Sequence, residues 1–449
     1  MPAHASRSAV SAALTSRPIC VAAALVHFSV KSLGISRFYS ADAARVRNYA
    51  GIQTTVLSYG MGVESTAILL RWCLEEDMRP CSLDRIVVIT AQVGDEYKDT
   101  GRDVESYVLP MMCRHGIRFV QVARHGHRKA DGITVLDDSR EPIKVFLDGD
   151  YKLSDELKRN GTVPQYGGVH RCALKFKAWV IEQWLEANLR GHAHQAFGYN
   201  AEERKRITQS ELASRERIAF GFNADETRQI DRSCEYNTLT RQSFYPLLDW
   251  DWNRARCVDY IRQKLGVTWR KSACIYCPFN SLKNDAIDRH LEHPAQVADA
   301  LLLEHMSMAL NPRGTLYKGT SLIQIATKTG NDEALTGYRQ RIDSARWAQY
   351  RVRRIYTRKG QADRAVEKLD VFTNAVEARA SLAGVAAAFG LPVEELRGVP
   401  YVWRQRRSET EFPTREEFWT IAPAIVEAKA RRGLAWFEAR WTNRQMGLF

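Results

Sequence analysis

Short hydrophobic runs alternate with amphipathic stretches in the first half of the chain. TTVLS (54–58) predicts a short buried strand, and ESTAILLRWCLEE (64–76) predicts a helix because its apolar residues recur every three or four positions. RIVVITA (85–91) and IRFVQVAR (117–124) predict two more strands, and a helical pattern over 99–116 lies between them. Strands this uniformly hydrophobic are typical of a sheet that is covered on both faces.

The same alternation continues further along the chain. AWVIEQWLEANL (178–189) predicts a helix, whereas HQAFGYN (194–200) and IAFGFN (218–223) predict strands. Strands that alternate with helices favour parallel pairing, with the helices packed on both faces of the sheet. We therefore expect an α/β fold built on a doubly wound parallel sheet.

The pattern changes after about residue 330, where charged stretches dominate. YRQRIDSARWAQYRVRRIYTRKG (338–360) predicts a long charged helix. We expect three parts: a poorly ordered N-terminal extension over 1–50, a sheet domain with a CxxC motif over 51–282, and a mainly helical, basic C-terminal region over 283–449.

The net charge of +13 over 449 residues is concentrated at the two ends of the chain. Residues 1–50 carry six basic residues and one acidic residue, and residues 331–449 carry 21 basic and 15 acidic residues. A basic surface attracts nucleic acid or another polyanion, so the C-terminal region is a candidate nucleic-acid contact. A solvated helical surface explains the same charge equally well.

Cysteine usage and hydropathy indicate a cytoplasmic protein with no membrane partner. Nine cysteines in so long a chain do not suggest a disulfide framework, and no apolar run reaches the roughly 18 residues of a membrane span. Residues 1–50 are rich in Ala, Ser and Arg and have no acid before Asp42. That composition suits an organellar transit peptide, an upstream extension or a disordered tail.

The first predicted strand and helix are joined by a glycine-bearing turn within VLSYGMGVESTAILL (56–70). Gly60 and Gly62 can adopt backbone angles that bulkier residues resist, and they allow main-chain N–H groups to approach a ligand. Together with the helix N-terminus, such N–H groups form an anion site. The alternative is a Ser-capped helix after a tight turn.

GMGVES (60–65) resembles the SGGxDS pyrophosphate loop of the ATP pyrophosphatase and phosphoadenosine phosphosulfate (PAPS) reductase superfamily. Gly62 and Ser65 match, Glu64 replaces Asp, and Gly60 and Met61 replace the first Ser and Gly, for which Ser58 is a substitute. The family's later motifs are matched in order by four segments: TAQVGDEYKDT (90–100), HRCALKFKAW (170–179), GFNADETRQ (221–229) and SFYPLLDWDWNRARCVDYI (243–261). The resemblance covers roughly residues 54–280.

The resemblance implies an adenine nucleotide α-hydrolase-like fold that binds ATP or an adenylylated sulfate. It places the nucleotide phosphates on the loop and its flanks, at Ser58, Gly60, Met61, Gly62, Val63, Glu64, Ser65 and Thr66. Asp95 and Glu96 are candidates for a Mg²⁺ or ribose contact, with a solvated acidic turn as the alternative. Ser65, Lys175 and Arg228 are the candidate catalytic residues, and Lys177 and Arg204 are further cations that could neutralise phosphate charge.

SACIYCPF (272–279) contains a CxxC motif whose thiolates, Cys274 and Cys277, can bind a metal. Cys172 lies where cluster-containing sulfonucleotide reductases carry a Cys-Cys pair. Three thiolates resemble the tRNA thiolation branch of the superfamily and suit a [4Fe-4S] cluster, with Cys234 or Cys257 as a further ligand. Structural zinc and the absence of any metal remain alternatives.

Three functions follow from the resemblance. In the first, the protein cleaves ATP to AMP and pyrophosphate and adenylates an acceptor, such as a nucleobase or nucleic acid, for sulfur transfer with the help of a sulfur-donor protein. In the second, it is a sulfonucleotide reductase, although the Glu-Cys-Gly-Leu-His segment that carries the reductase thiol is not found in the sequence. In the third, it is a non-enzymatic, nucleotide-gated module associated with nucleic acid.

Overall fold

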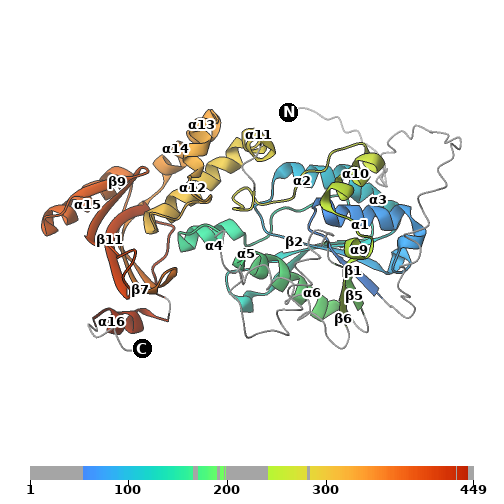
Figure 1. The fold of residues 1–449 in the computed structure, drawn as a ribbon, viewed down its shortest axis with the longest axis horizontal. Coiled ribbons are helices and arrows are strands. Elements are labelled where there is room, and N and C mark those ends of the chain that lie inside the picture. The colour runs from blue at the N-terminus through green and yellow to red at the C-terminus, as the bar shows by residue number, and fades with distance from the viewer. Residues whose placement is uncertain are drawn as a thin grey trace, which may run out of the picture. The chain divides into compact units, whose positions relative to one another are not determined.

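The first sheet has six strands in the order β4-β3-β2-β1-β5-β6 (Figure 1). In this computed structural model the described residues are 54–164, 170–189, 193–196, 198, 241–280, 284–430 and 432–442. The strands of the first sheet are β1 (Thr54–Ser58), β2 (Ile86–Gln92), β3 (Arg118–Arg124), β4 (Ile133–Ser139), β5 (Ala193–Ala196) and β6 (Arg241–Phe244). Neighbouring strands pair in parallel, except that β4 runs antiparallel to β3, so the sheet is mixed.

Helices cover both faces of this sheet. The helical segments of this part of the chain are α1 (Val63–Leu74), η2 (Glu76–Met78), η3 (Leu83–Arg85), α2 (Lys98–Asp103), η4 (Val104–Val108), α3 (Leu109–Arg114), η5 (Lys129–Asp131), α4 (Leu153–Asn160), α5 (Arg171–Ala173), η6 (Leu174–Ala178), α6 (Trp179–Asn188), α9 (Pro246–Asp249) and α10 (Arg254–Leu265). One hydrophobic cluster joins a face of the sheet to α1, α3 and α10, and another joins the opposite face to α6.

Most elements predicted for this part of the chain are confirmed within one or two residues at each end. The helix expected over 99–116 is present, but it contains a π-helical turn, η4, between α2 and α3. The edge strand β4 was not predicted, because its sequence ITVLDDS is polar and its residues are only partly buried. The strand expected over 218–223 lies outside the described residues.

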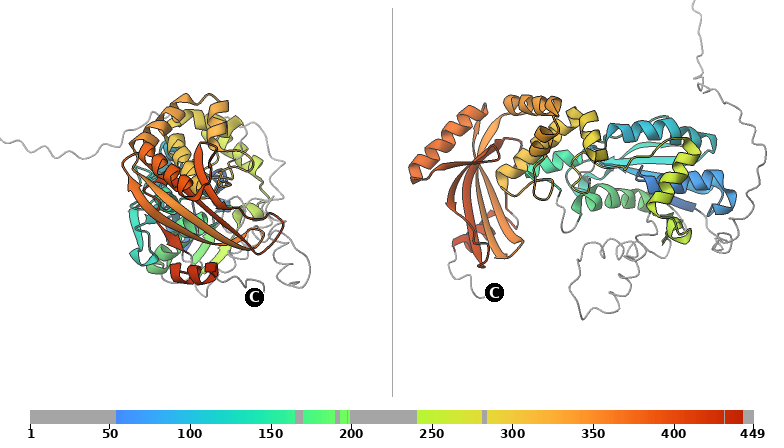
Figure 2. Two further views of the ribbon diagram at one scale, coloured as in Figure 1. Left: turned by 90° about the vertical axis from the view of Figure 1, so that its left-hand side faces the viewer. Right: turned by 45° about the horizontal axis from the view of Figure 1, so that its top comes forward.

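The C-terminal region contains a second six-stranded sheet, in the order β12-β8-β7-β11-β10-β9 (Figure 2). The segments before it are α11 (Asn284–Glu292), α12 (Pro294–Leu310), α13 (Leu322–Lys328) and α14 (Asp332–Ser344). The sheet and its helices are β7 (Trp347–Arg358), β8 (Gln361–Phe372), α15 (Ala375–Phe389), β9 (Val393–Leu396), β10 (Val399–Gln405), β11 (Thr414–Pro423), β12 (Lys429–Ala430) and α16 (Leu434–Thr442). All of its strand pairs are antiparallel.

The prediction of a mainly helical C-terminal region is therefore wrong for residues 347–430. The helix expected over 338–360 ends with α14 at Ser344, and the chain continues as β7. The arginines of β7 suggested a solvated helix, but in the sheet they pair with carboxylates of neighbouring strands. Arg351 Nη2 lies 2.5 Å from Glu417 Oε1, and Arg353 Nη2 lies 2.6 Å from Glu367 Oε1.

The second sheet is packed on both faces. Tyr350, Val352 and Phe418 belong to a large cluster that also contains α12 and part of α4. On the other face, Trp347 and Trp419 pack against α15. Among the described residues, no helix is both long and apolar enough to cross a membrane.

Candidate functional site

A short turn joins β1 to α1 at the carboxyl end of the strand. β1 ends at Ser58 and α1 begins at Val63, with Gly62 at the N-cap position. Gly62 has extended backbone angles (φ −88°, ψ 177°), and its helix has no side-chain cap. The N–H groups of a first helical turn have no partner within the helix, so this end of α1 has the donors that an anion requires.

The residue that bends this turn is Met61, not a glycine. Met61 has a φ of +58°, in the left-handed region, whereas neither Gly60 nor Gly62 has a positive φ. Trp269 Nε1 holds the bend by donating to the carbonyl oxygen of Met61 at 3.0 Å. The glycines provide space instead: a Cβ on Gly62 would lie 3.1 Å from Ser272 Oγ, and a Cβ on Gly60 would meet no atom within 4 Å. The expectation that unusual glycine angles shape the loop is wrong, whereas the close approach of a ligand to its N–H groups stays a prediction.

The polar side chains of the loop are occupied by protein neighbours. These contacts are Ser58 Oγ with Gln195 Nε2 (2.9 Å), Ser65 Oγ with the carbonyl of Gly62 (3.3 Å), Thr66 Oγ1 with the Tyr59 hydroxyl (3.1 Å) and Glu64 Oε1 with Arg254 Nη1 (2.7 Å). The side chain of Val63 is buried in the core beneath the loop. These residues therefore hold the shape of the loop, and its main-chain N–H groups are the donors left for a ligand.

Asp95 and Glu96, the acidic pair after β2, are bonded to the protein rather than directed into open space. Asp95 Oδ2 accepts a hydrogen bond from the N–H of Ser154 at 2.9 Å, and burial raises the pKa of the Asp95 carboxyl. Glu96 is 3% exposed and accepts from the N–H of Ala273, and burial raises its pKa as well. The N–H of Ile275 bonds to the carbonyl of Asp95 at 3.1 Å. This arrangement fits a role in positioning the CxxC segment and does not fit an open Mg²⁺ site.

Of the candidate catalytic cations, Lys175 is paired with a carboxylate outside the loop. Its Nζ forms an ion pair of 2.5 Å with Glu156 Oε1 on α4. Lys177 lies two residues further along the π-helical segment η6. It is half-buried and interacts electrostatically with Glu96 and the cysteines. Arg204 and Arg228 lie outside the described residues, as does the whole GFNADETRQ segment.

Cys172 lies close enough to Cys277 to raise the pKa of its thiol, although about 100 residues separate them in sequence. Cys172, Cys274 and Cys277 all pack against the same hydrophobic cluster. Burial opposes the charged form of Lys177, but Glu96 and the three cysteine sulfurs together raise its pKa above the usual value. Lys177 therefore lies close enough to Glu96 and to the three thiols to interact electrostatically with them.

Burial raises the pKa of each of these three thiols, so without a bound metal they are protonated at neutral pH. A metal would displace the protons, because thiolates are the ligands. Thiolates on one tetrahedral zinc ion lie roughly 3.8 Å apart. Among the described residues these sulfurs do not form a group within 4.8 Å of one another, so a single-ion site is not pre-formed.

Two buried tyrosine hydroxyls lie close to this cysteine group. Tyr317 is 5% exposed and close enough for Cys277 to raise its pKa, and Tyr97 is 1% exposed and interacts with Tyr317. Within the described part of the chain, neither hydroxyl has a hydrogen-bond partner. Unpartnered buried hydroxyls, three thiols and a buried cation together fit a negatively charged sulfur-rich group.

Among the described residues, Cys73, Cys81, Cys113 and Cys257 have other surroundings. Cys73 and Cys257 are buried in the other cluster, around α1 and α10, so Cys257 is not placed with the three as a fourth ligand. Cys113 donates to the carbonyl of Pro142. Cys234 lies outside the described residues.

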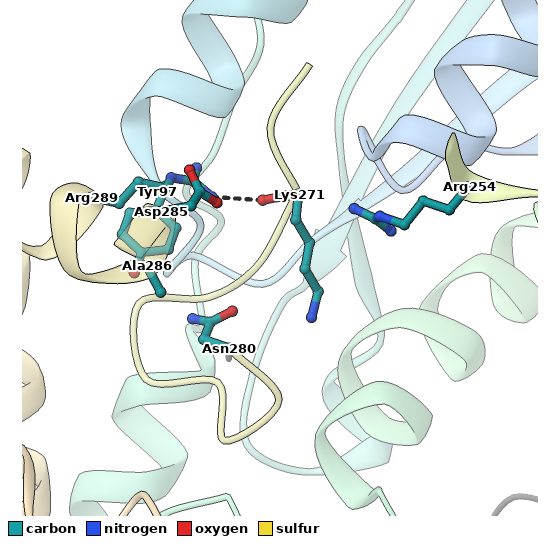
Figure 3. A pocket seen from close by; sticks show the side chains of 7 residues that line it. All are labelled: Tyr97, Arg254, Lys271, Asn280, Asp285, Ala286 and Arg289. Carbon is teal, nitrogen blue, oxygen red and sulfur yellow. Dashed lines mark hydrogen bonds between the residues drawn. The ribbon is translucent and has the colours of Figure 1, made fainter. Parts of the chain in front are cut away.

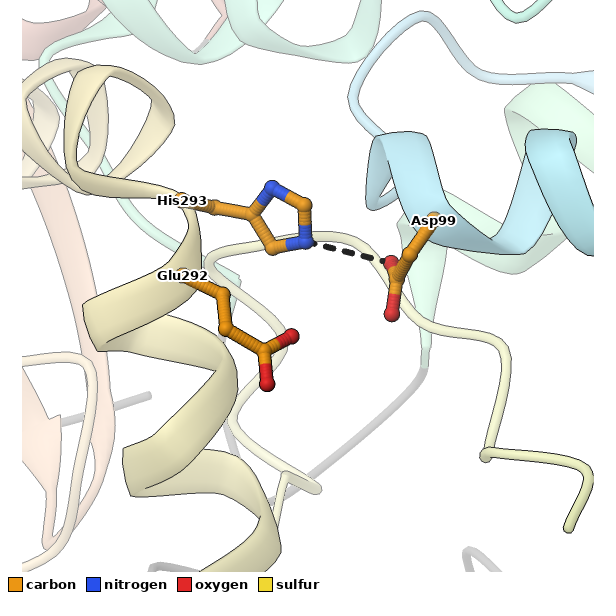
Figure 4. Close-up of side chains that lie close together, drawn as sticks. All are labelled: Asp99, Glu292 and His293. Atoms are coloured by element: carbon orange, nitrogen blue, oxygen red, sulfur yellow. Dashed lines mark ion pairs between the residues drawn. The ribbon is translucent and has the colours of Figure 1, made fainter.

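A second group of polar residues, which the sequence did not indicate, lies where α2 meets α11. The ligand atoms of Asp99, Glu292 and His293 lie within 4.8 Å of one another (Figure 4). Arg289 Nη2 is 2.8 Å from Asp99 Oδ1, and Arg270 Nη1 is 2.5 Å from Glu292 Oε2. Two guanidinium groups already neutralise the carboxylates, so the group is an ion-pair network rather than a cation site.

A pocket of about 390 Å³ opens beside this network (Figure 3). It is lined by Tyr97, Arg254, Lys271, Asn280, Asp285, Ala286 and Arg289. Its residues come from α2's N-terminal side, α10, the CxxC segment and α11, so no single sequence motif marks it. The positive lining residues outnumber the one carboxylate, Asp285.

Comparisons with known proteins found no match: no family model, no curated protein and no solved structure is significantly similar to this chain.

Proposed function

We propose that the chain is an adenine-nucleotide-binding enzyme of the PP-loop type that cleaves ATP between the α and β phosphates and adenylates an acceptor for sulfur transfer. An acceptor oxygen attacks the α-phosphorus, the bond to the bridging oxygen breaks, and pyrophosphate leaves. A sulfur nucleophile then displaces AMP from the acceptor. The order of the first sheet, with parallel strands and helices on both faces, is compatible with the doubly wound fold of that superfamily.

The observation that carries the proposal is the contact between the loop and the CxxC segment. Ser272 Oγ donates to the carbonyl oxygen of Gly60 at 2.7 Å, and Cys274 follows two residues later. A phosphate held at the N-terminus of α1 would therefore lie next to the segment that carries the thiols. Nucleotide activation and sulfur chemistry need such proximity, because displacement follows adenylation on the same acceptor.

Cys172, Cys274 and Cys277 would hold an iron–sulfur cluster, which would supply or carry the sulfur when bound. Lys177 would stabilise the negative charge of the thiolates from within the group. The thiols are otherwise protonated, so loading should release protons.

Gly60 gives the sharpest test, because it is exposed and a Cβ there would meet no atom within 4 Å. Gly60→Val should leave the fold intact and place two methyl groups where the phosphates must lie. We expect ATP binding, measured by calorimetry on the full chain, to fall below detection. Gly384→Ala is the matched control, since Gly384 on α15 also has open space around it.

Equal ATP affinities of the wild type and the Gly60→Val variant would refute the loop as the phosphate site. Product analysis then separates the alternatives: pyrophosphate release supports adenylation, and turnover of an adenylylated sulfate with a thiol donor supports a reductase. Nucleotide binding without either reaction would support a nucleotide-gated module.

A further inference from the structure

Three cations line the pocket of Figure 3: Arg254 and Arg289 are paired with Glu64 and Asp99, whereas Lys271 has no carboxylate partner among the described residues. Arg289 is 3% exposed and fixed: it donates to the carbonyl of Lys271 at 2.6 Å and to Asp99 at 2.8 Å, and lies 3.8 Å over the Tyr97 ring. It forms a rigid wall of the pocket, not a mobile surface cation.

Lys271 is the cation best placed to meet a ligand. It is exposed, and its Nζ uses one donor on the carbonyl of Phe279 at 2.8 Å. An ammonium group has three donors, so two remain for a ligand. Figure 3 shows its side chain reaching between Arg254 and Asn280.

Polar selectivity in the pocket can come from Asn280, which is 7% exposed. Its Nδ2 donates to the carbonyl of Cys274 at 3.1 Å, and its Oδ1 lies on the side of the amide that faces Lys271 (Figure 3). An amide fixed in this way can accept a hydrogen bond from a ligand. The volume of about 390 Å³ is within the range of small-molecule sites, roughly 300–1,000 Å³.

We propose that this pocket is a second anion site, separate from the α1 loop, and that it binds the phosphate group of an acceptor of about nucleotide size. Lys271 would hold the phosphate together with the donors of Arg254 that its ion pair with Glu64 leaves free, and Asn280 would contact the polar body attached to it. The assignment of this ligand as the acceptor rests on the proposed function, whereas the binding of a phosphate-bearing molecule does not. The same chemistry is offered by a free mononucleotide and by a single-stranded polynucleotide.

Two substitutions with opposite expected effects test the pocket. Lys271→Gln removes a cation and should weaken binding about tenfold, because a hydrogen bond to a charged group is lost. Asp285→Asn removes the one carboxylate and should tighten binding by roughly two- to fivefold. Lys264→Gln, on the exposed side of α10, is the matched control and should bind like the wild type.

The measurement is fluorescence anisotropy on the full chain saturated with a non-hydrolysable ATP analogue, which occupies the loop. The probes are labelled mononucleotides in one arm, and labelled single-stranded DNA and RNA tetranucleotides in the other. The arm with the tighter saturable binding identifies the source of the phosphate. Binding should also weaken as salt rises.

The proposal is overturned if no probe binds saturably, or if Lys271→Gln and Asp285→Asn bind as the wild type does. Equal loss of ATP and probe binding in Lys271→Gln would make the pocket part of the ATP site; the separate site would fail while the proposed function survived. If the wild-type protein binds a probe but shows no ATP binding, the pocket is supported and the proposed function is refuted.

Discussion

Lys177→Met tests the charge balance at the centre of the cysteine group. Glu96 is 3% exposed, and Lys177 is a cation that interacts with it. Removing one partner of a buried pair costs about 3–5 kcal/mol, because the other charge stays buried without compensation. Lys177 is only half-buried, its Nζ is not within 4 Å of a Glu96 oxygen, and Arg289 also lowers the pKa of Glu96, so a smaller loss, about 1–2 kcal/mol, is expected.

The loss should depend on pH in a defined direction. Burial raises the folded-state pKa of Glu96, and removal of Lys177 would raise it further. The folded state then binds more protons than the unfolded state, so stability falls as pH rises from the unfolded pKa towards the folded one. Lys177→Met should therefore be closer to the wild type at pH 5 than at pH 8.

The assay is denaturant unfolding followed by tryptophan fluorescence at both pH values. Glu96→Gln combined with Lys177→Met should recover most of the lost stability, because the neutral amide can still accept from the N–H of Ala273. Lys264→Met, an exposed substitution, is the control. An equal loss at pH 5 and pH 8, or no recovery in the double variant, would show that Lys177 does not compensate Glu96.

Two further substitutions test the loop and the thiols independently. Ser272→Ala removes the hydrogen bond to Gly60, worth about 1 kcal/mol, and should weaken ATP binding about fivefold in calorimetry. Ser381→Ala on α15 is the control and should not change the ATP affinity. An unchanged ATP affinity in Ser272→Ala would show that the loop and the CxxC segment are not coupled. Cys274→Ser should abolish iron and sulfide in anaerobically purified protein, while Cys73→Ser, in the other core cluster, should retain both. Equal iron contents in the two variants would contradict the cluster assignment.

The sequence predicts an element best where its pattern of hydrophobic residues matches its burial in the folded protein. β2 is buried on both faces and most of its residues are hydrophobic, so its bounds were predicted closely. β7 shows the opposite case. Its arginines look solvated in sequence, yet Arg353 is 2% exposed, and carboxylates of β8 (Glu367) and α16 (Glu438) pair with it. Only the pairing of distant strands reveals that such a segment is a buried strand.

In the candidate site, too, the features set by local sequence were predicted and those set by distant residues were not. The turn before α1 was predicted because glycine and a helix start are local features, but the bend at Met61 depends on Trp269, some 200 residues further along. The three cysteines were predicted together from a resemblance, whereas the interaction of Lys177 with Glu96 and with these thiols was not predicted. The pocket lining comes from segments with no shared motif and was not predicted.

The charge of the C-terminal region also changes meaning once its partners are known. Sequence counts 21 basic residues over 331–449 and suggests a nucleic-acid surface. In the structure, many of these arginines form ion pairs within the same region, including Arg351, Arg353, Arg354, Arg379, Arg406 and Arg407. A guanidinium bonded to a carboxylate releases little counterion on meeting a phosphate, so formal charge overstates the attraction of this surface for nucleic acid. Lys271, which lies beside the CxxC segment and bonds to a carbonyl rather than to a carboxylate, is thus a better location for a phosphate-bearing acceptor than the basic C-terminal sheet.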